Sequence, residues 1–175
     1  MQRARNAILV VGVGNELLSD EGVGVHVARR LSVLMKKLPP WVEVIDAGTA
    51  LFDVLGELPL HSHVILVDAM RGGGEPGSIY RLDKGAELAD RGEPGTPTSL
   101  HQWGVVETLR AARTLGLEPR NLTVIGIEPE TLEPSTDLSP AVAGAAERVV
   151  EMLLAELGAP LAATSPPPCR EPATP

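Results

Sequence analysis

The sequence contains very little cysteine. Its one cysteine among 175 residues, Cys169, lies near the C-terminus, where prolines stand at 166–168, 172 and 175. A disulfide framework needs paired cysteines, and a thiol nucleophile needs a partner that activates it. The sequence therefore excludes a disulfide-stabilised domain and gives no support to thiol catalysis.

Long apolar runs and excess positive charge are also absent. No apolar run approaches the roughly 18 residues of a membrane-spanning helix. The 23 acidic residues outnumber the 15 lysines and arginines, so the net charge of -8 leaves no basic stripe for nucleic acid. Residues 1–5 carry two arginines, but the apolar segment after them is short and shows no cleavage-site pattern. We therefore expect a cytoplasmic protein that neither enters a membrane nor binds nucleic acid.

The composition is that of a globular protein. Hydrophobic residues make up 43% of the chain, and 175 residues are enough for one domain with a sizeable core. Residues 160–175 are rich in proline and show no periodic apolar face. We predict a single domain over residues 1–159 and a disordered tail over residues 160–175.

Apolar strand patterns alternate with helical ones along the chain, which is typical of an α/β protein. The predicted strands cover 8–11, 42–47, 63–69 and 122–127. The predicted helices cover 20–37, a short segment that is capped by Thr49 or Asp53 and ends near residue 58, 105–115, and 140–157 with Ser139 as its cap. Turn signals over 72–77 precede a short strand at 78–81, and a long loop runs from 84 to 98. We predict a mostly parallel, twisted, five-stranded sheet with helices on both faces, forming three layers, whose short strand is antiparallel.

A glycine-rich turn follows the first predicted strand. Gly12 and Gly14 fit the first two glycines of the dinucleotide fingerprint, but Leu17 occupies the third position. Glu16 would repel a pyrophosphate there, so the turn points toward a metal instead. We expect Asp20 to cap the helix that follows. Because ligands of open α/β sheets bind beyond the carboxyl ends of the strands, Glu16 is placed for chemistry, although a lone loop glutamate can also be merely solvated.

Two further residues are expected at the same edge of the sheet. Asp68 ends a buried strand, and His101 stands between the long loop and the next helix. Taken singly, Asp68 could cap a turn and His101 could face solvent. Together with Glu16 they form an open set of carboxylates and imidazole that suits zinc, nickel or iron, and their spacing does not choose among these metals.

Four motifs give the chain a resemblance to the nickel-iron hydrogenase maturation endopeptidases, from about Ala7 to Leu157. The family pattern G-[IV]-G-N-x-L-x-x-D-[DE]-G-x-G is met by residues 12–24. The other matches are V-D-A at 67–69, the histidine segment at 99–101 and G-I-x-P at 126–129. One departure is present, since the usual D-G-G-T reads Asp46-Ala47-Gly48-Thr49 here.

The resemblance implies a specific activity. Glu16, Asp68 and His101 match the nickel-contacting residues of the family, and they double as the catalytic cluster. The substrate would be the precursor of a hydrogenase large subunit, whose C-terminal extension is removed once nickel is in place. Nickel would then be carried by the precursor, and the enzyme would act as a monomer. We expect Asp46 either to support this cluster or simply to cap its turn.

The mechanism of peptide cleavage and two rival functions stay open at this point. No Ser-His-Asp, Cys-His or H-E-x-x-H arrangement is readable, so water is the expected nucleophile, activated by the metal or by a carboxylate. A nickel-binding accessory protein without peptidase activity would use the same three ligands. Peptidyl-tRNA hydrolase also begins with a strand and G-x-G-N, but it continues Asn-Pro-Gly and needs a basic surface, which this acidic chain lacks.

Overall fold

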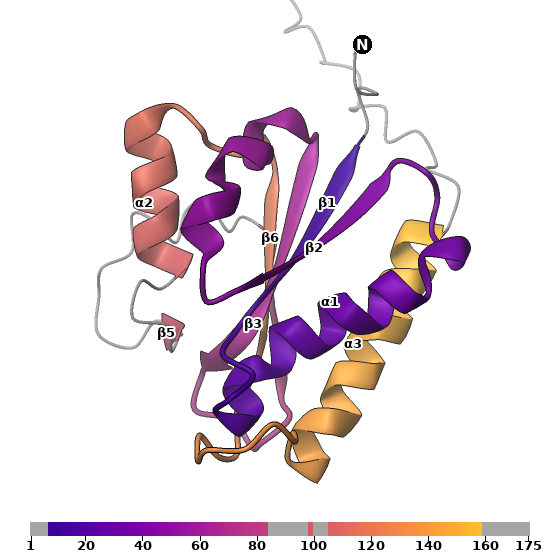
Figure 1. The fold of residues 1–175 in the computed structure, drawn as a ribbon, viewed down its shortest axis with the longest axis vertical. Coiled ribbons are helices and arrows are strands. Elements are labelled where there is room, and N and C mark those ends of the chain that lie inside the picture. The colour runs from indigo at the N-terminus through magenta and orange to yellow at the C-terminus, as the bar shows by residue number, and fades with distance from the viewer. Residues whose placement is uncertain (1–6, 84–97, 100–104, 159–175) are drawn as a thin grey trace, which may run out of the picture.

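The computed structural model describes residues 7–83, 98–99 and 105–158 (Figure 1). The strands are β1 (Ile8–Val13), β2 (Val42–Gly48), β3 (His63–Arg71), β4 (Ile79–Leu82), β5 (Thr98–Ser99) and β6 (Leu122–Ile127). The α-helices are α1 (Val23–Val33), α2 (Val105–Leu115) and α3 (Pro140–Gly158). Three 3-10 helices join them: η1 (Ser19–Gly22), η2 (Met35–Lys37) and η3 (Leu51–Leu60). No helix in these described ranges is long and apolar enough to cross a membrane.

The sheet has the predicted architecture. Its strand order is β2-β1-β3-β6-β4, with parallel pairing from β2 through β6 and antiparallel pairing between β6 and the edge strand β4. The two-residue strand β5 pairs antiparallel with the end of β3, Met70 opposite Ser99 and Arg71 opposite Thr98. Residues 98–99 fall at the end of the predicted loop, and two residues are too few to show a strand periodicity.

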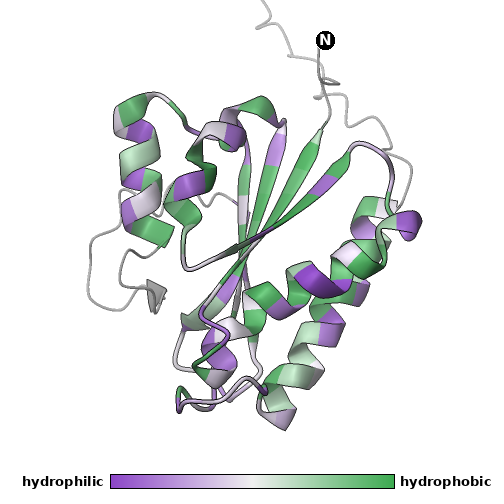
Figure 2. Ribbon diagram, viewed as in Figure 1, coloured by the Kyte–Doolittle hydropathy of each residue, from purple (hydrophilic) through white to green (hydrophobic). Residues whose placement is uncertain are grey.

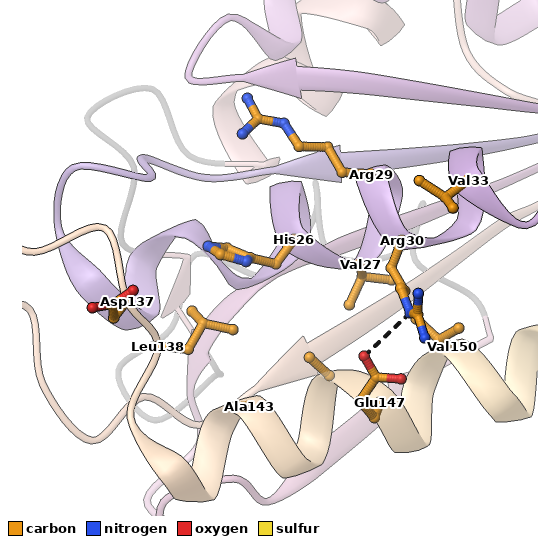
Figure 3. A pocket seen from close by; sticks show the side chains of 11 residues that line it. His26, Val27, Arg29, Arg30, Val33, Asp137, Leu138, Ala143, Glu147 and Val150 are labelled. Atoms are coloured by element: carbon orange, nitrogen blue, oxygen red, sulfur yellow. Dashed lines mark ion pairs between the residues drawn. The ribbon is translucent and has the colours of Figure 1, made fainter.

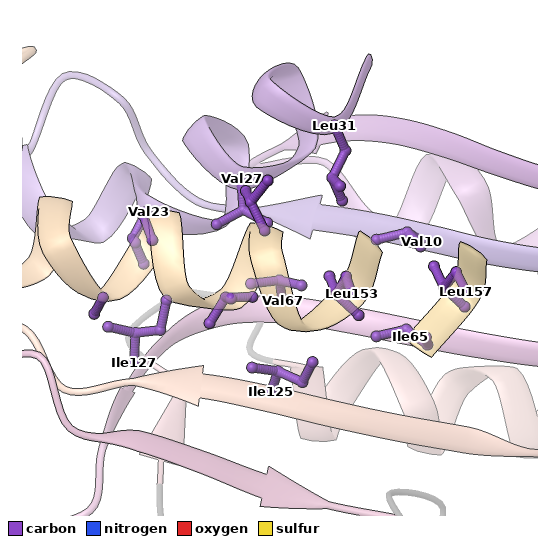
Figure 4. Close-up of a cluster of buried hydrophobic side chains, with 14 of the residues drawn as sticks. Val10, Val23, Val27, Leu31, Ile65, Val67, Ile125, Ile127, Leu153 and Leu157 are labelled. Carbon is purple, nitrogen blue, oxygen red and sulfur yellow. The ribbon is translucent and has the colours of Figure 1, made fainter. Parts of the chain in front are cut away.

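Helices cover both faces of the sheet. In Figure 1, α1 and α3 lie on one face, and α2 and η3 lie on the other. The buried strand β1 supplies Val10 to the core under α1 and α3, whereas its neighbour Leu9 joins the core under η3 and α2. Because both faces are covered, the central strands consist mostly of apolar residues, as Figure 2 shows. Figure 4 shows Val27 and Leu31 of α1 and Leu153 of α3 meeting the side chains of the sheet.

Two glycines allow α1 to lie directly on the sheet backbone. A Cβ atom on Gly24 would be 2.1 Å from the carbonyl oxygen of Val67 and 2.3 Å from that of Val13. A Cβ on Gly12 would be 2.1 Å from the carbonyl oxygen of Gly24. The glycines of the motif at 12–24 therefore serve close packing, which fixes the start of α1 over the carboxyl ends of β1 and β3.

Three predicted helix caps are wrong. The segment predicted as one helix from Asp20 is divided into η1, α1 and η2, and neither η1 nor α1 has a side-chain N-cap. The next helix, η3, begins after Ala50 with no side-chain cap, so neither Thr49 nor Asp53 caps it. Ser139 precedes α3 as predicted, but its hydroxyl has no hydrogen-bond partner among the described residues. The carboxylate of Asp20 instead accepts the N–H of Ser139 itself.

Candidate active site

Glu16 lies on the turn that leaves β1. The N–H of Gly14 donates to the carbonyl oxygen of Gly48 (2.8 Å), which joins the ends of β1 and β2, and the side chain of Asn15 accepts from the N–H of Leu17 (3.1 Å). A Cβ on Gly22 would be 2.7 Å from the Cα of Glu16, so this glycine lets η1 pack against the turn. The Glu16 side chain is 42% exposed and faces solvent at the carboxyl edge of the sheet.

Asp46 lies beside this turn, near the end of β2. It pairs with Gly12 across the sheet, and the register shifts so that Val13 pairs with Gly48, which leaves Ala47 in a bulge. The Asp46 carboxylate accepts the N–H of Gly48 at 3.0 Å. Gly48 has a φ of 52°, whereas Ala47 has no positive φ. Alanine is therefore tolerated at the one position that departs from D-G-G-T, because the left-handed conformation falls on the glycine after it.

Arg29 connects Glu16 to Asp46. Its Nη1 donates to Oε2 of Glu16 in a short contact, and its Nε donates to Oδ2 of Asp46 at 2.8 Å. These hydrogen bonds, first to Glu16 and then to Asp46, raise the pKa of Arg29 above its ordinary value. Sequence reasoning missed Arg29, since the periodicity of this helix identifies its apolar face and says nothing about partners of a surface arginine.

Asp68 lies within β3 and is completely buried, in contrast to Glu16. It follows Val67, which forms the last β1–β3 pair with Gly12, and its Oδ1 accepts the N–H of Ala69 at 2.8 Å. Asp68 was predicted to end its strand, but β3 continues to Arg71, and Asp68 lies beneath the molecular surface.

His101 lies outside the described residues. Within the described ranges, no three His, Cys, Asp or Glu side chains are grouped so that they could hold a metal ion. The nearest described residue before His101 in the sequence is Ser99, which pairs with Met70, two residues after Asp68. The chain therefore returns to the end of β3 just before it reaches His101.

Asp20 is a fully buried carboxylate that organises the loop between β6 and α3. One oxygen accepts the N–H groups of Glu130 (2.9 Å) and Thr131 (3.0 Å), and the other accepts the N–H of Ser139 (2.7 Å) at the start of α3. The acidic residue of the glycine-rich motif therefore satisfies amides more than 100 residues away.

Glu128, which directly follows β6, also accepts backbone N–H groups of a distant turn. Its Oε2 accepts the Tyr80 hydroxyl (2.6 Å) and the N–H groups of Gly72 (2.7 Å) and Gly74 (3.3 Å). Burial of Glu128 opposes its charge, but these hydrogen bonds outweigh burial and lower its pKa below the ordinary value. The glycine turn after β3 is thereby folded around a carboxylate. A glutamate before Pro129 at a strand end was the available sequence signal, and its partners were not readable from it.

A groove of about 500 Å³ lies between α1 and α3, and Arg29 is among the residues that line it. Figure 3 shows Arg30 reaching across it toward Glu147 of α3, with an Nε to Oε1 distance of 3.4 Å, whereas Arg29 extends to the other side of α1. Glu16, Asp46 and Asp68 are not among the residues that line the groove. Glu16 and Asp46 therefore lie outside this groove, with side chains that are 42% and 30% exposed, and Asp68 lies buried within the sheet.

These features define an α/β protein with a carboxylate site at the carboxyl edge of its sheet, and comparison with known proteins assigns its family. A family model described as hydrogenase maturation protease matches residues 25–156. The hydrogenase 2 maturation protease of Escherichia coli K12 is 38% identical over 154 residues, which are 86% of this chain and 90% of that protein. The structure of the E. coli hydrogenase maturating endopeptidase HybD is similar with a TM-score of 0.68 at 36% identity, covering 86% of this chain and 91% of that one. A [NiFe] hydrogenase maturation protease HycI from Thermococcus kodakarensis gives 0.72 at 27% identity, with coverage of 87% and 92%.

The chain belongs to the hydrogenase maturation protease family. It is a peptidase that acts in hydrogenase maturation. Dinucleotide binding and peptidyl-tRNA hydrolysis, the readings that share its glycine-rich turn, are therefore set aside.

Proposed function

We propose that this peptidase removes the C-terminal extension from the precursor of a nickel-iron hydrogenase large subunit after nickel has been inserted. The observation that carries the proposal is the position of Glu16 and Asp68 near the carboxyl ends of the neighbouring strands β1 and β3. Ligands of open α/β sheets bind beyond this edge. We place the reaction in the cytoplasm.

Nickel is the recognition element in this proposal, and the precursor brings it. Glu16, Asp68 and His101 offer two carboxylates and an imidazole, which is too few ligands to close a site around a metal. The precursor supplies the remaining ligands, so full coordination is reached only when enzyme and loaded precursor meet. The return of the chain to β3 at Ser99, two residues before His101, supports the inclusion of His101 in the set.

Cleavage is proposed to be a metal-assisted hydrolysis with water as the nucleophile. A carboxylate of the cluster can accept a proton from the attacking water, and the substrate-borne cation can polarise the scissile carbonyl group. Glu16 is the better placed of the two carboxylates for contact with water, because its side chain is 42% exposed while Asp68 is completely buried.

The test is to incubate the purified chain with nickel-loaded and nickel-free precursor and to follow the loss of the C-terminal extension. We expect cleavage of the loaded form alone. Glu16→Gln, Asp68→Asn and His101→Ala should abolish processing. For Glu16→Gln, whose side chain is 42% exposed, the melting temperature should stay close to that of the unmodified chain. The control is Asp53→Asn, which changes an exposed carboxylate of η3 and should leave processing unchanged.

Binding measurements separate this function from that of a nickel carrier. The free enzyme should hold nickel weakly and bind loaded precursor far better than apo precursor, as calorimetric titration would show. Equal affinity for both precursors, or nickel that stays with the free enzyme through dialysis against a chelator, would contradict the proposal. Retained cleavage by all three variants would remove these residues from the mechanism.

A further inference from the structure

Glu16, a carboxylate proposed to contact the metal, already has a cationic partner. Arg29 donates through Nη1 to Glu16 and through Nε to Asp46, so one guanidinium holds two acidic side chains at the carboxyl ends of the neighbouring strands β1 and β2. The side chains of Arg29, Glu16 and Asp46 are 57%, 42% and 30% exposed. This is an exposed cluster that an incoming cation can reach.

The two contacts of Arg29 are not equivalent. Asp46 is held independently, because its other oxygen accepts the N–H of Gly48 at 3.0 Å. If the Glu16 carboxylate turns to another cation, Arg29 can remain attached to Asp46 through Nε. Arg29 therefore has an anchored contact and a releasable one, and the releasable contact is to Glu16.

We propose that Arg29 is a specificity-determining residue that occupies the Glu16 carboxylate and so disfavours binding of free divalent cations. The proposal rests on the function proposed above, in which Glu16 contacts the precursor's nickel. An aqueous nickel ion must displace the guanidinium and gains few protein ligands in return. A precursor brings further contacts along the polypeptide, and these offset the loss of the Arg29–Glu16 pair. An arginine suits this task because it stays charged at all physiological pH values and its planar fork spans two carboxylates.

The experiment is a calorimetric titration of the full chain with nickel chloride. Arg29→Ala should bind free nickel about tenfold more tightly than the unmodified chain, since a charge-assisted hydrogen bond no longer competes. Arg29→Lys keeps the charge but loses the planar fork that spans both carboxylates, so its affinity should lie between those of the unmodified chain and Arg29→Ala. Combining Arg29→Ala with Glu16→Gln should abolish the gain.

Arg30→Ala is the matched control. Arg30 is the next residue on α1, is 51% exposed, and pairs with Glu147 instead of the cluster. Its removal changes the net charge by the same amount, so it measures the long-range effect of a lost cation, which we expect to be within twofold. Equal nickel affinities of the Arg29→Ala and Arg30→Ala chains, or weaker binding after Arg29→Ala, would overturn the proposal. Arg29→Gln, which retains much of the side chain, provides the same comparison if the alanine variant does not fold.

Processing assays distinguish failure of this inference from failure of the proposed function. An unmodified chain that does not cleave nickel-loaded precursor contradicts the function, whatever Arg29 does. With cleavage intact, free nickel should inhibit the Arg29→Ala chain at about a tenfold lower concentration than the Arg30→Ala chain. Identical inhibition curves would contradict the role of Arg29 alone.

Discussion

The carboxylate of Asp20 shows how much of this fold can depend on one side chain. It is completely buried and accepts three backbone N–H groups from residues 130, 131 and 139. These amides belong to a segment that contains no regular helix or strand between β6 and α3. Without the buried carboxylate, three partly buried N–H groups would lose their acceptor, which costs more than an ordinary surface hydrogen bond.

We therefore predict that Asp20→Asn lowers the free energy of unfolding by about 2–4 kcal/mol. The asparagine side chain has no charge, and its NH2 group would face backbone N–H groups that need an acceptor. Urea denaturation followed by circular dichroism measures the change. Asp137→Asn is the control, since Asp137 lies in the same loop with an exposed side chain, and it should change stability by less than about 0.5 kcal/mol. Similar losses for both substitutions would show that Asp20 is not specially placed.

For single residues, the sequence predicts the helix, strand or turn in which a side chain lies better than it predicts which groups that side chain contacts. Asp68 could be placed near the end of its strand because an unbroken apolar run precedes it. Its complete burial and the pairing of Arg29 with Glu16 and Asp46 could not be predicted, because both depend on how separate elements pack. The prediction that Asp20 caps its own helix was wrong for the same reason: a distant loop satisfies that carboxylate.

Among the elements, the contact of α1 with β1 and β3 leaves the least space. A Cβ on Gly24 would be 2.1 Å from the carbonyl oxygen of Val67, and backbone atoms of a buried strand cannot easily move aside. We predict that Gly24→Ala costs about 3 kcal/mol or more, as measured by thermal or urea unfolding.

Gly144→Ala provides the opposite case for this prediction. Gly144 lies in the second turn of α3, and a Cβ there would meet only Nη1 of Arg148, at 3.6 Å. Alanine should stabilise the helix by about 0.5–1 kcal/mol, because glycine loses more backbone entropy on folding. If Gly24→Ala also proved neutral or stabilising, the close packing of α1 would not be what the motif glycines provide.

The types of element were well predicted, and their boundaries and caps less well. Apolar strand patterns identified the four parallel strands, and three- and four-residue spacing identified the long helices. The division of the first helical region into η1, α1 and η2 has no clear signature in apolar spacing, because 3-10 and α-helical turns place apolar residues at similar intervals.

For the whole molecule, the described core is complete before the proline-rich end of the chain. Helix α3 ends at Gly158, and its last buried core residue is Leu157. The tail predicted over residues 160–175 lies outside the described residues. We predict that a chain ending at Pro160 melts within about 2 °C of the full chain and processes precursor equally well.

Alkylation of Cys169 in the full chain provides a second check of this prediction and should leave processing unchanged. A large fall in melting temperature after truncation would show that the tail belongs to the folded unit. Loss of cleavage after alkylation would reopen a thiol mechanism.

The place of β6 in the sheet has a consequence for biosynthesis. β6 lies between β3 and β4, although both of those strands leave the ribosome before it does. Until residues 122–127 emerge, the nascent chain carries an open edge on the apolar strand β3 and a β4 without the partner it has in the sheet. α3, which covers one face, follows later still. We infer that closure of the sheet waits until synthesis is almost finished, so the growing polypeptide is the stage most dependent on chaperones and most open to aggregation.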